Sequence, residues 1–330
     1  MEQRKSDHIN LALETQTSEI EKDTRFNYEP MLSAHPRDNI PRVDIGGKSL
    51  EAPLWISSMT GGTEGARTIN HNLARLAHEF GLGMGLGSCH VLLRNEKHLP
   101  DFDLRGIMGD ERPFYANMGI AQIEEYVSKG KMQTVTDLIA LLKADGLVVH
   151  VNPLQEWLQP EGDRILHPPI ETIRELVRQV DFPLIVKEVG QGMGLESLRA
   201  LLELPLAAVE FGAFGGTNFA KLELMRHEQA QKGLLQPLAF IGQTARDMTQ
   251  HVNQLVEEHA TIQTKSLIIS GGIKNFLDGY HLTSKSKLPA AYGMASTFLQ
   301  YAKKDYESLR EFTVGQLEGL KIAYAFLRVL

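Results

Sequence analysis

The sequence has a single cysteine, Cys89, among its 330 residues, so an internal disulfide is excluded and a reducing compartment is expected. It also lacks an excess of positive charge: 34 Lys and Arg stand against 41 Asp and Glu, which argues against a nucleic-acid partner. No uncharged apolar run reaches the roughly 18 residues that a membrane helix needs, and no signal-peptide core is present. We therefore expect a cytoplasmic globular protein without nucleic-acid or membrane partners.

Short apolar runs are present in regular succession after residue 50, with amphipathic stretches between them. Neighbouring runs are mostly about 25 to 40 residues apart, which is the length of one strand–helix unit. Eight such units are the number found in a (β/α)8 TIM barrel. We predict an N-terminal extension over residues 1–50 and a barrel over 51–330. The predicted strands are 54–58, 82–88, 114–118, 147–151, 184–188, 207–211, 267–270 and 290–295, and the clearest helices are 67–80, 134–143, 170–180 and 244–259.

The fourth run, 147–151, leads into a dense group of polar side chains. Pro153 disfavours helical geometry at the residue before it, so the strand is expected to end at Asn152. Ligands of parallel α/β proteins bind at this edge of the sheet. Glu156 could bind Mg²⁺, which typically takes one or two carboxylates; the alternative is a first-turn helix carboxylate that interacts with the helix dipole. The group comprises His150, Asn152, Gln155 and Glu156.

Small residues follow the seventh and eighth runs. Loops at these two places of a TIM barrel commonly hold a phosphate between backbone N–H groups. Gly271 and Gly272 let the backbone approach a ligand closely, because neither has a Cβ atom. A simple tight turn is the alternative for this glycine pair. Gly293 to Ser296 form the second small-residue loop.

Lys187 ends the fifth run and offers a cation inside the predicted barrel. Such a cation could stabilise the negative charge at the N1–C2=O edge of a reduced flavin. The alternative is an internal salt bridge with Glu188 or Glu210. Polar residues at other strand ends are suited to hydrogen-bonding the edge of a heterocycle: Thr60, Ser88, Asn117 and Thr217.

An ordered series of motifs extends from Arg4 to about Leu299. It consists of Arg4-Lys5-x-Asp7-His8, Ser58-Met59-Thr60-Gly61-Gly62, Asn117, His150-x-Asn152-x-x-Gln155-Glu156, Lys187-Glu188-x-Gly190, Gly216-Thr217 and Ser270-Gly271-Gly272. In this order the motifs resemble those of the FMN-dependent type 2 isopentenyl diphosphate isomerases. The resemblance implies a TIM barrel that uses FMN, Mg²⁺ and a reductant such as NADPH to interconvert isopentenyl and dimethylallyl diphosphate. It also implies a homo-oligomer, a tetramer or an octamer.

The resemblance assigns roles to individual residues. Gln155 would lie beside the reacting alkene, Glu156 would bind Mg²⁺, and the catalytic residues would be Gln155, His150 and Lys187. Substrate would be bound by Arg4, Lys5, His150, Asn152 and Gln155. FMN would contact Ser58, Met59, Thr60, Ser88, Asn117, Lys187 and Thr217, with its phosphate on Gly271, Gly272, Ile273, Ala295 and Ser296. The chain departs from the family at Cys89-His90, where many members have Gln-Arg.

The implied reaction moves a double bond without net transfer of electrons. We therefore expect the reduced flavin to act as acid, base or both, while bound diphosphate fixes the alkene over its ring. One rival hypothesis is an FMN-dependent oxidoreductase of the 2-hydroxy acid oxidase type. Those enzymes use a His-Gly-Gly-Arg-like segment after the sixth or seventh strand, whereas this chain has Gly215-Gly216-Thr217-Asn218. A non-catalytic flavin-binding barrel would account for the glycines and Lys187 but not for the His150–Glu156 group.

Overall fold

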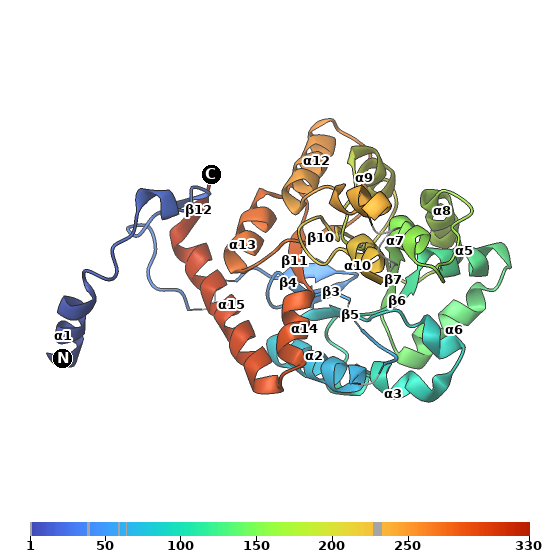
Figure 1. Ribbon diagram of the computed structural model, residues 1–330, viewed down its shortest axis with the longest axis horizontal. Coiled ribbons are helices and arrows are strands. Elements are labelled where there is room, and N and C mark those ends of the chain that lie inside the picture. Colours follow the sequence, from blue (N-terminus) through green and yellow to red (C-terminus); the bar gives the residue numbers. More distant parts are fainter. Residues whose placement is uncertain (1, 38–39, 59, 64, 227–232) are drawn as a thin grey trace.

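The computed structural model describes residues 2–37, 40–58, 60–63, 65–226 and 233–330. Within these residues, eight parallel strands form a closed barrel that is surrounded by helices (Figure 1). The strands follow one another around the barrel in chain order, and the last pairs with the first. They are β4 (Leu54–Ile56), β5 (Gly83–Gly85), β6 (Phe114–Gly119), β7 (Gly146–Val151), β8 (Leu184–Glu188), β9 (Ala208–Glu210), β10 (Ser266–Ser270) and β11 (Ala290–Met294).

Each predicted apolar run overlaps one of these strands, and β6, β7 and β10 extend one residue beyond their runs, so the TIM-barrel prediction is confirmed. The runs are apolar throughout because parallel barrel strands are buried on both faces. The long covering helices alternate with the strands and bury one apolar side each, as the four predicted helices do. They are α2 (Ala66–Phe80), α5 (Ile120–Ser128), α6 (Met132–Leu142), α8 (Pro169–Gln179), α9 (Leu195–Leu202), α12 (Ala245–Glu257), α13 (Phe276–Lys285) and α15 (Tyr306–Phe326).

Shorter helices lie in the connections at the ends of the strands. They are α3 (Leu99–Phe102), α4 (Arg105–Met108), α7 (Pro153–Leu158), α10 (Phe219–Arg226) and α14 (Ser296–Ala302), with 3-10 turns at Glu19–Glu21, His90–Leu93, Glu96–His98 and Gln236–Phe240. Among the described residues, no helix is long and apolar enough to cross a bilayer.

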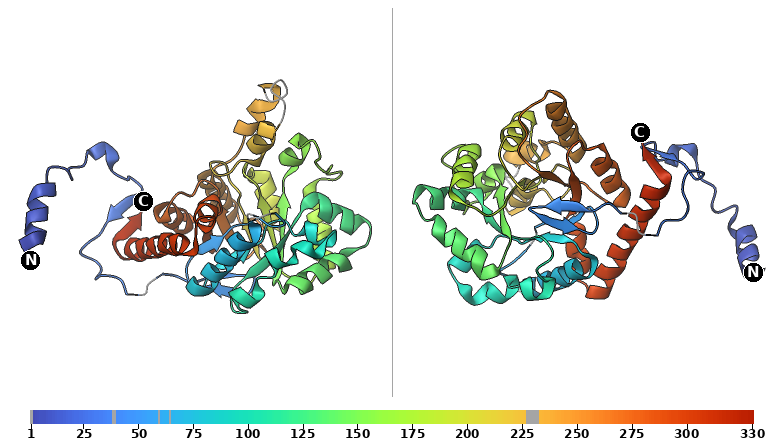
Figure 2. Two further views of the ribbon diagram at one scale, coloured as in Figure 1. Left: turned by 60° about the horizontal axis from the view of Figure 1, so that its bottom comes forward. Right: turned by 180° about the vertical axis from the view of Figure 1, so that it is seen from behind.

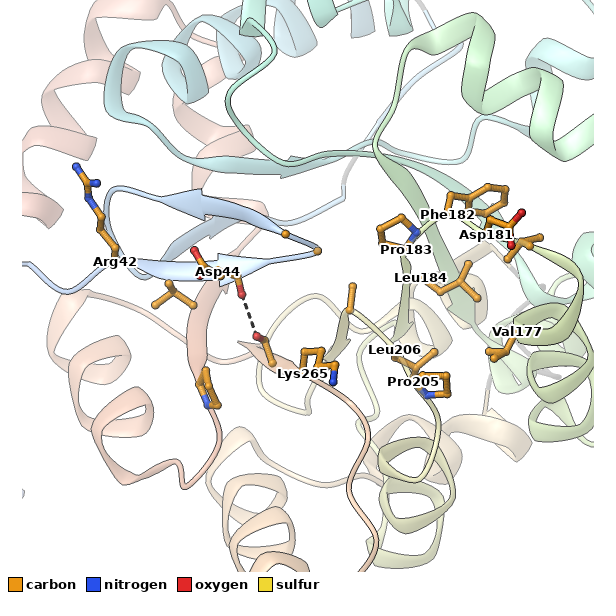
Figure 3. Close-up of a pocket in the computed structure, with 17 residues that line it drawn as sticks. Arg42, Asp44, Val177, Asp181, Phe182, Pro183, Leu184, Pro205, Leu206 and Lys265 are labelled. Atoms are coloured by element: carbon orange, nitrogen blue, oxygen red, sulfur yellow. Dashed lines mark hydrogen bonds between the residues drawn. The ribbon is translucent and has the colours of Figure 1, made fainter.

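A β-hairpin covers the end of the barrel at which the strands begin (Figure 2, right). Its strands β2 (Val43–Ile45) and β3 (Lys48–Leu50) bury Ile45 and Leu50 against side chains of the barrel interior. Ser266 donates a hydrogen bond to the carbonyl of Asp44 over 2.9 Å (Figure 3). Gly46 turns the hairpin with φ +59°, and any side chain there would collide with the Tyr115 hydroxyl. This end of the barrel is therefore closed.

Asp145, just before β7, joins this hairpin to the barrel wall. Its carboxylate lies 2.6 Å from Lys48 Nζ and 2.9 Å from Arg105 Nη2, and it accepts the backbone N–H of Phe114 over 2.9 Å. Arg105 is 5% exposed, so its charge depends on this partner.

Replacing Asp145 by Ala is expected to lower the free energy of unfolding by about 3 kcal/mol, because a buried guanidinium loses its counter-charge. Urea denaturation measures the change. The matched variant Lys48→Ala removes the more exposed partner and should cost at most about 1 kcal/mol. Equal losses in the two variants would show that Arg105 does not depend on Asp145.

Residues 2–37, the part of the N-terminal extension that precedes the hairpin, make only local contact with the rest of the domain. Strand β1 (Phe26–Tyr28) pairs antiparallel with β12 (Leu327–Val329), and Arg25 lies 2.7 Å from Asp278. Beyond this point the chain leaves the domain, and α1 (Glu2–Leu11) projects away from it on the far side of α15 (Figures 1 and 2).

Candidate active site

Eight of the twelve predicted cofactor residues line one cavity at the carboxyl ends of the strands. The cavity measures about 290 Å³ and is lined by the ends of β8 to β11 and the residues after β4. A larger cavity of about 800 Å³ lies beside the hairpin at the opposite end, and none of the predicted site residues that the structure describes line it (Figure 3). Predicted residues that line the smaller cavity are Ser58, Lys187, Thr217, Gly271, Gly272, Ile273, Ala295 and Ser296.

The glycine loop after β10 is packed tightly against the loop after β9. Gly271 and Gly272 have φ values of +91° and +76°, and a side chain at Gly271 would collide with the carbonyl of Ala213. A Cβ atom on Gly216 would lie 3.1 Å from the backbone nitrogen of Gly272. The pair therefore makes the predicted tight turn and at the same time leaves bare backbone along the cavity wall.

Lys187 lines the cavity and is 8% exposed. Its Nζ donates to the carbonyl of Glu188 over 2.9 Å, and in the described part of the chain no ion pair joins it to Glu188 or Glu210. The Glu188 carboxylate instead accepts the backbone N–H groups of Gly190, Gln191 and Gly192 over 2.6 to 2.9 Å, while burial raises its pKa. The positive charge of Lys187 therefore remains available to a ligand.

A hydrogen-bonded chain joins three of the predicted residues across β4, β6 and β7. Asn117 donates from Nδ2 to Ser58 Oγ over 3.0 Å, and its Oδ1 lies 2.7 Å from His150 Nδ1. With the amide in this orientation, His150 donates its Nδ1 hydrogen to Asn117. Burial, together with the charge of Lys187, lowers the pKa of His150 to about 3. The imidazole is therefore neutral at physiological pH.

This half-buried, neutral imidazole makes folding sensitive to pH. Below pH 6.5 the unfolded chain binds a proton at His150 that the folded chain does not bind until about pH 3. The contribution of neutral His150 to the free energy of unfolding is therefore fully present well above pH 6.5, and it is lost as the pH falls from 6.5 toward 3. Between pH 6.5 and 5, we expect the free energy of unfolding to fall more steeply in the wild type than in His150→Asn, with the difference approaching about 1.4 kcal/mol per pH unit near pH 5. Denaturation series without ligand measure this difference; parallel pH profiles would contradict the prediction.

The polar side chains that follow β7 form hydrogen bonds with one another at the start of α7. Asn152 Nδ2 donates to Gln155 Oε1 over 3.1 Å and to Glu156 Oε1 over 2.9 Å, while Glu156 Oε2 accepts the backbone N–H of Asp163 over 2.8 Å. Asn152 is 3% exposed, yet its Oδ1 atom has no hydrogen-bond partner within the described part of the chain. An unpartnered buried oxygen is costly, so this atom is available to a ligand.

Glu156 fits a magnesium ion that shares its coordination with a substrate. Each of its carboxylate oxygens has one hydrogen bond and keeps a free lone pair. No group of three His, Cys, Asp or Glu side chains in the described residues could hold a metal on its own. Mg²⁺ usually keeps water and takes one or two carboxylates plus substrate phosphate oxygens, and a lone carboxylate is compatible with that.

Glu223, on α10, completes the group and was not anticipated from the sequence. It is 2% exposed, accepts from Gln155 Nε2 over 3.2 Å and lies 2.6 Å from Arg226 Nη1. The only sequence signal is a carboxylate three residues before an arginine in the long connection after the sixth strand. Gln155 is thereby held between Asn152 and Glu223.

Several predicted residues lie elsewhere. Thr60, Ser88 and Asn117 do not line the cavity, and Thr60 is held by a hydrogen bond from Asn70 to its carbonyl. Arg4 and Lys5 are exposed on the projecting helix α1, so this structure does not bring them to the other site residues. Met59 lies outside the described residues.

The Cys89-His90 departure from the family motif concerns two side chains that face different surroundings. Cys89 is fully buried, donates to the carbonyl of Gly87, and has its pKa raised to about 12 by burial. It therefore has no reactive thiolate. The pKa of His90 is lowered by its burial and by Arg94.

The fold and the site define an α/β-barrel protein with a ligand site at the carboxyl ends of its strands. No family model matches the chain. Among solved structures it is similar to flavocytochrome b2 with sulfite bound (TM-score 0.63, 12% identity, 91% of this chain and 71% of that one) and to a mandelate oxidase variant with an FMN adduct (TM-score 0.56, 12% identity, 93% and 88%). At this identity the likeness concerns the fold alone.

Curated relatives give a narrower assignment. The isopentenyl-diphosphate delta-isomerase of Rickettsia peacockii (strain Rustic) is 34% identical over 329 residues, covering 97% of this chain and 92% of that protein. The protein of the same name from a Synechococcus species is 35% identical over 326 residues, covering 97% and 90%. The chain belongs to the isopentenyl-diphosphate delta-isomerase family and is an enzyme, as its motifs predict.

Proposed function

We propose that the enzyme interconverts isopentenyl and dimethylallyl diphosphate by a 1,3-allylic proton shift, for isoprenoid biosynthesis, with reduced FMN and Mg²⁺ bound and NADPH as the external reductant. The observation that carries the proposal is that Lys187, the glycine loops and the Asn152–Glu156 group follow parallel strands of one barrel and so lie at the same end of it, with Lys187 and the glycine loops lining one cavity there. The proposal includes a cytoplasmic homo-oligomer, a tetramer or an octamer.

FMN would be held by the 290 Å³ cavity. Its phosphate would lie on the backbone of Gly271, Gly272 and Ile273 and of Ala295 and Ser296, where small residues allow close approach. Lys187 would hold its charge at the ring edge, and Ser58 and Thr217, which line the cavity, would offer hydrogen bonds. The family resemblance adds Met59, Thr60, Ser88 and Asn117 as FMN contacts; of these, Thr60, Ser88 and Asn117 lie outside the cavity lining in this structure. Bound reduced FMN would supply an electron-rich ring able to give and take a proton at the alkene.

The substrate diphosphate would be bound by the polar group after β7. Glu156 would hold Mg²⁺ against phosphate oxygens, and Asn152 and His150 would contact the same end of the substrate. Gln155, fixed at both ends by Asn152 and Glu223, would border the alkene without reorienting during turnover. These residues add no redox chemistry: they fix the five-carbon chain over the ring while one proton is added and another is removed.

Arg4 and Lys5 would complete the diphosphate site from a neighbouring subunit. Helix α1 stands clear of its own barrel, which favours delivery to a second copy. Charge-assisted hydrogen bonds to phosphate are strong enough to order such a segment.

This arrangement predicts complementation between two inactive variants. Arg4→Ala/Lys5→Ala keeps Glu156, and Glu156→Gln keeps the basic pair, so a co-expressed mixed oligomer contains sites that are intact. We expect its kcat to be well above that of either variant alone. Mixed oligomers no more active than the two parents would place the basic pair in the subunit that carries it.

Purified protein tests the proposal when it is incubated with isopentenyl diphosphate, FMN, NADPH and Mg²⁺, each omitted in turn. We expect dimethylallyl diphosphate only in the complete mixture. The rival oxidoreductase predicts that flavin is reduced by a 2-hydroxy acid instead, so lactate and mandelate are offered in parallel. Flavin reduction by either acid without isomerisation would replace the proposed function with the rival one.

A further inference from the structure

Glu210, the last residue of β9, carries a buried oxygen atom that no described residue of the protein satisfies. The residue is fully buried and lines the cavity. Its Oε1 accepts from Ser270 Oγ over 3.2 Å, but its Oε2 has no hydrogen-bond partner among the residues that the structure describes. Ser57 Oγ, on the wall of the same cavity, is likewise buried and unpartnered.

The nearest candidate cation does not account for this carboxylate. Lys187 pairs with Glu210 in the strand register, but its Nζ donates to the carbonyl of Glu188, and no ion pair with Glu210 is present in the part of the chain described. Leaving a carboxylate oxygen unpaired in a buried site is costly. A ligand in the cavity that donates a hydrogen bond would remove this cost.

The position of β9 in the barrel identifies the part of the ligand that Glu210 would face. Strand order places β9 between β8, which carries Lys187, and β10, which ends in the phosphate loop at Gly271. If FMN lies with its ring edge at Lys187 and its phosphate at Gly271, the segment over β9 is the ribityl chain that joins them. A carboxylate accepts hydrogen bonds but donates none, so it suits hydroxyl groups and repels phosphate.

We infer that Glu210 accepts a hydrogen bond from a ribityl hydroxyl of the cofactor and so anchors the chain between ring and phosphate. This role rests on the proposed FMN site and makes Glu210 a cofactor-positioning residue. It also explains why an acidic side chain faces a cavity that must accept a phosphate elsewhere: the contact selects a flavin with a polyhydroxylated linker.

Two flavins and two variants test the inference. Wild type, Glu210→Leu and Glu210→Gln are each titrated with FMN and with a hydroxyl-free flavin phosphate, in which CH2 groups replace the CHOH groups of the ribityl chain. Flavin fluorescence reports the Kd of each complex. Glu210→Leu should weaken FMN binding by about 10- to 100-fold, the range for a lost hydrogen bond to a charged group. Its Kd for the hydroxyl-free flavin should stay within about twofold of wild type. Glu210→Gln keeps a carbonyl acceptor, so its loss should be smaller and again confined to FMN.

The outcomes separate this inference from the proposed function. If Glu210→Leu does not fold, the same contrast in Glu210→Gln decides, and thermal unfolding without ligand verifies that each variant is native. Equal weakening of both flavins, or unchanged FMN binding in a folded variant, would overturn the inference while leaving the FMN site in place. Failure of the wild type to bind either flavin would overturn both.

Discussion

Replacing Glu156 by Gln is expected to lower kcat/KM for isopentenyl diphosphate by about 1000-fold while the Kd for FMN stays unchanged. The carboxylate is the one proposed protein ligand of Mg²⁺, and the amide has the same shape without the charge. A metal that polarises phosphate oxygens contributes several kcal/mol, and about 4 kcal/mol corresponds to this loss. In the wild type, Asn152 and the backbone of Asp163 each donate a hydrogen bond to one carboxylate oxygen of Glu156. In Glu156→Gln, the amide NH2 would face one of these two donors.

Steady-state rates as a function of Mg²⁺ concentration, with flavin fluorescence on the same preparations, measure both parts of the prediction. Glu171→Gln is the matched control, because Glu171 is an exposed carboxylate in the first turn of α8. If Glu156 only interacted with the helix dipole, the two variants would have similar activities. A variant at 156 that has lost FMN together with activity would likewise contradict the assigned role.

Replacing Lys187 by Gln is expected to reduce kcat by about 100- to 1000-fold and to raise the pKa of N1 in the bound reduced flavin. The buried ammonium would stabilise the anionic form of the reduced ring, and removal of one such preorganised donor typically costs this much. The effect should be large because Lys187 is not neutralised by Glu188 or Glu210 in the described structure.

Absorbance titration of the reduced, protein-bound flavin reports the pKa, and turnover reports kcat. Lys274→Gln provides the control, since Lys274 lines the same cavity but is exposed to water. Loss of activity without a shift in the flavin pKa would mean that Lys187 acts on the substrate or on the fold. A flavin pKa shift of the same size in Lys274→Gln would show that any positive charge near the cavity has this effect, not Lys187 in particular.

Much of this architecture is predictable because a parallel barrel imposes the same demand on every strand. Each strand is buried on both faces, so apolar runs at regular spacing reveal all eight. Residues that follow these runs meet at one end of the barrel, which is why Lys187, Thr217 and Gly271 come together although distant in sequence.

The remaining features depend on contacts that have no periodic signature. Glu223 becomes part of the site only because α10 lies against α7, and its partner Gln155 is 68 positions away in the chain. Likewise, Gly46 is needed for its approach to Tyr115, and the pairing of β1 with β12 joins the two ends of the chain. The sequence does not predict where α1 lies, because its side chains are mostly exposed and no buried face fixes its position.

The central claim, a proton shift without net electron transfer, is tested most directly by turnover in D₂O. The enzyme is reduced with a limited amount of NADPH, supplied with Mg²⁺ and isopentenyl diphosphate, and the product is analysed by mass spectrometry while NADPH and flavin absorbance are followed. The account predicts solvent deuterium in dimethylallyl diphosphate and many turnovers for each NADPH consumed. One NADPH oxidised per product molecule, or a product free of solvent deuterium, would contradict it.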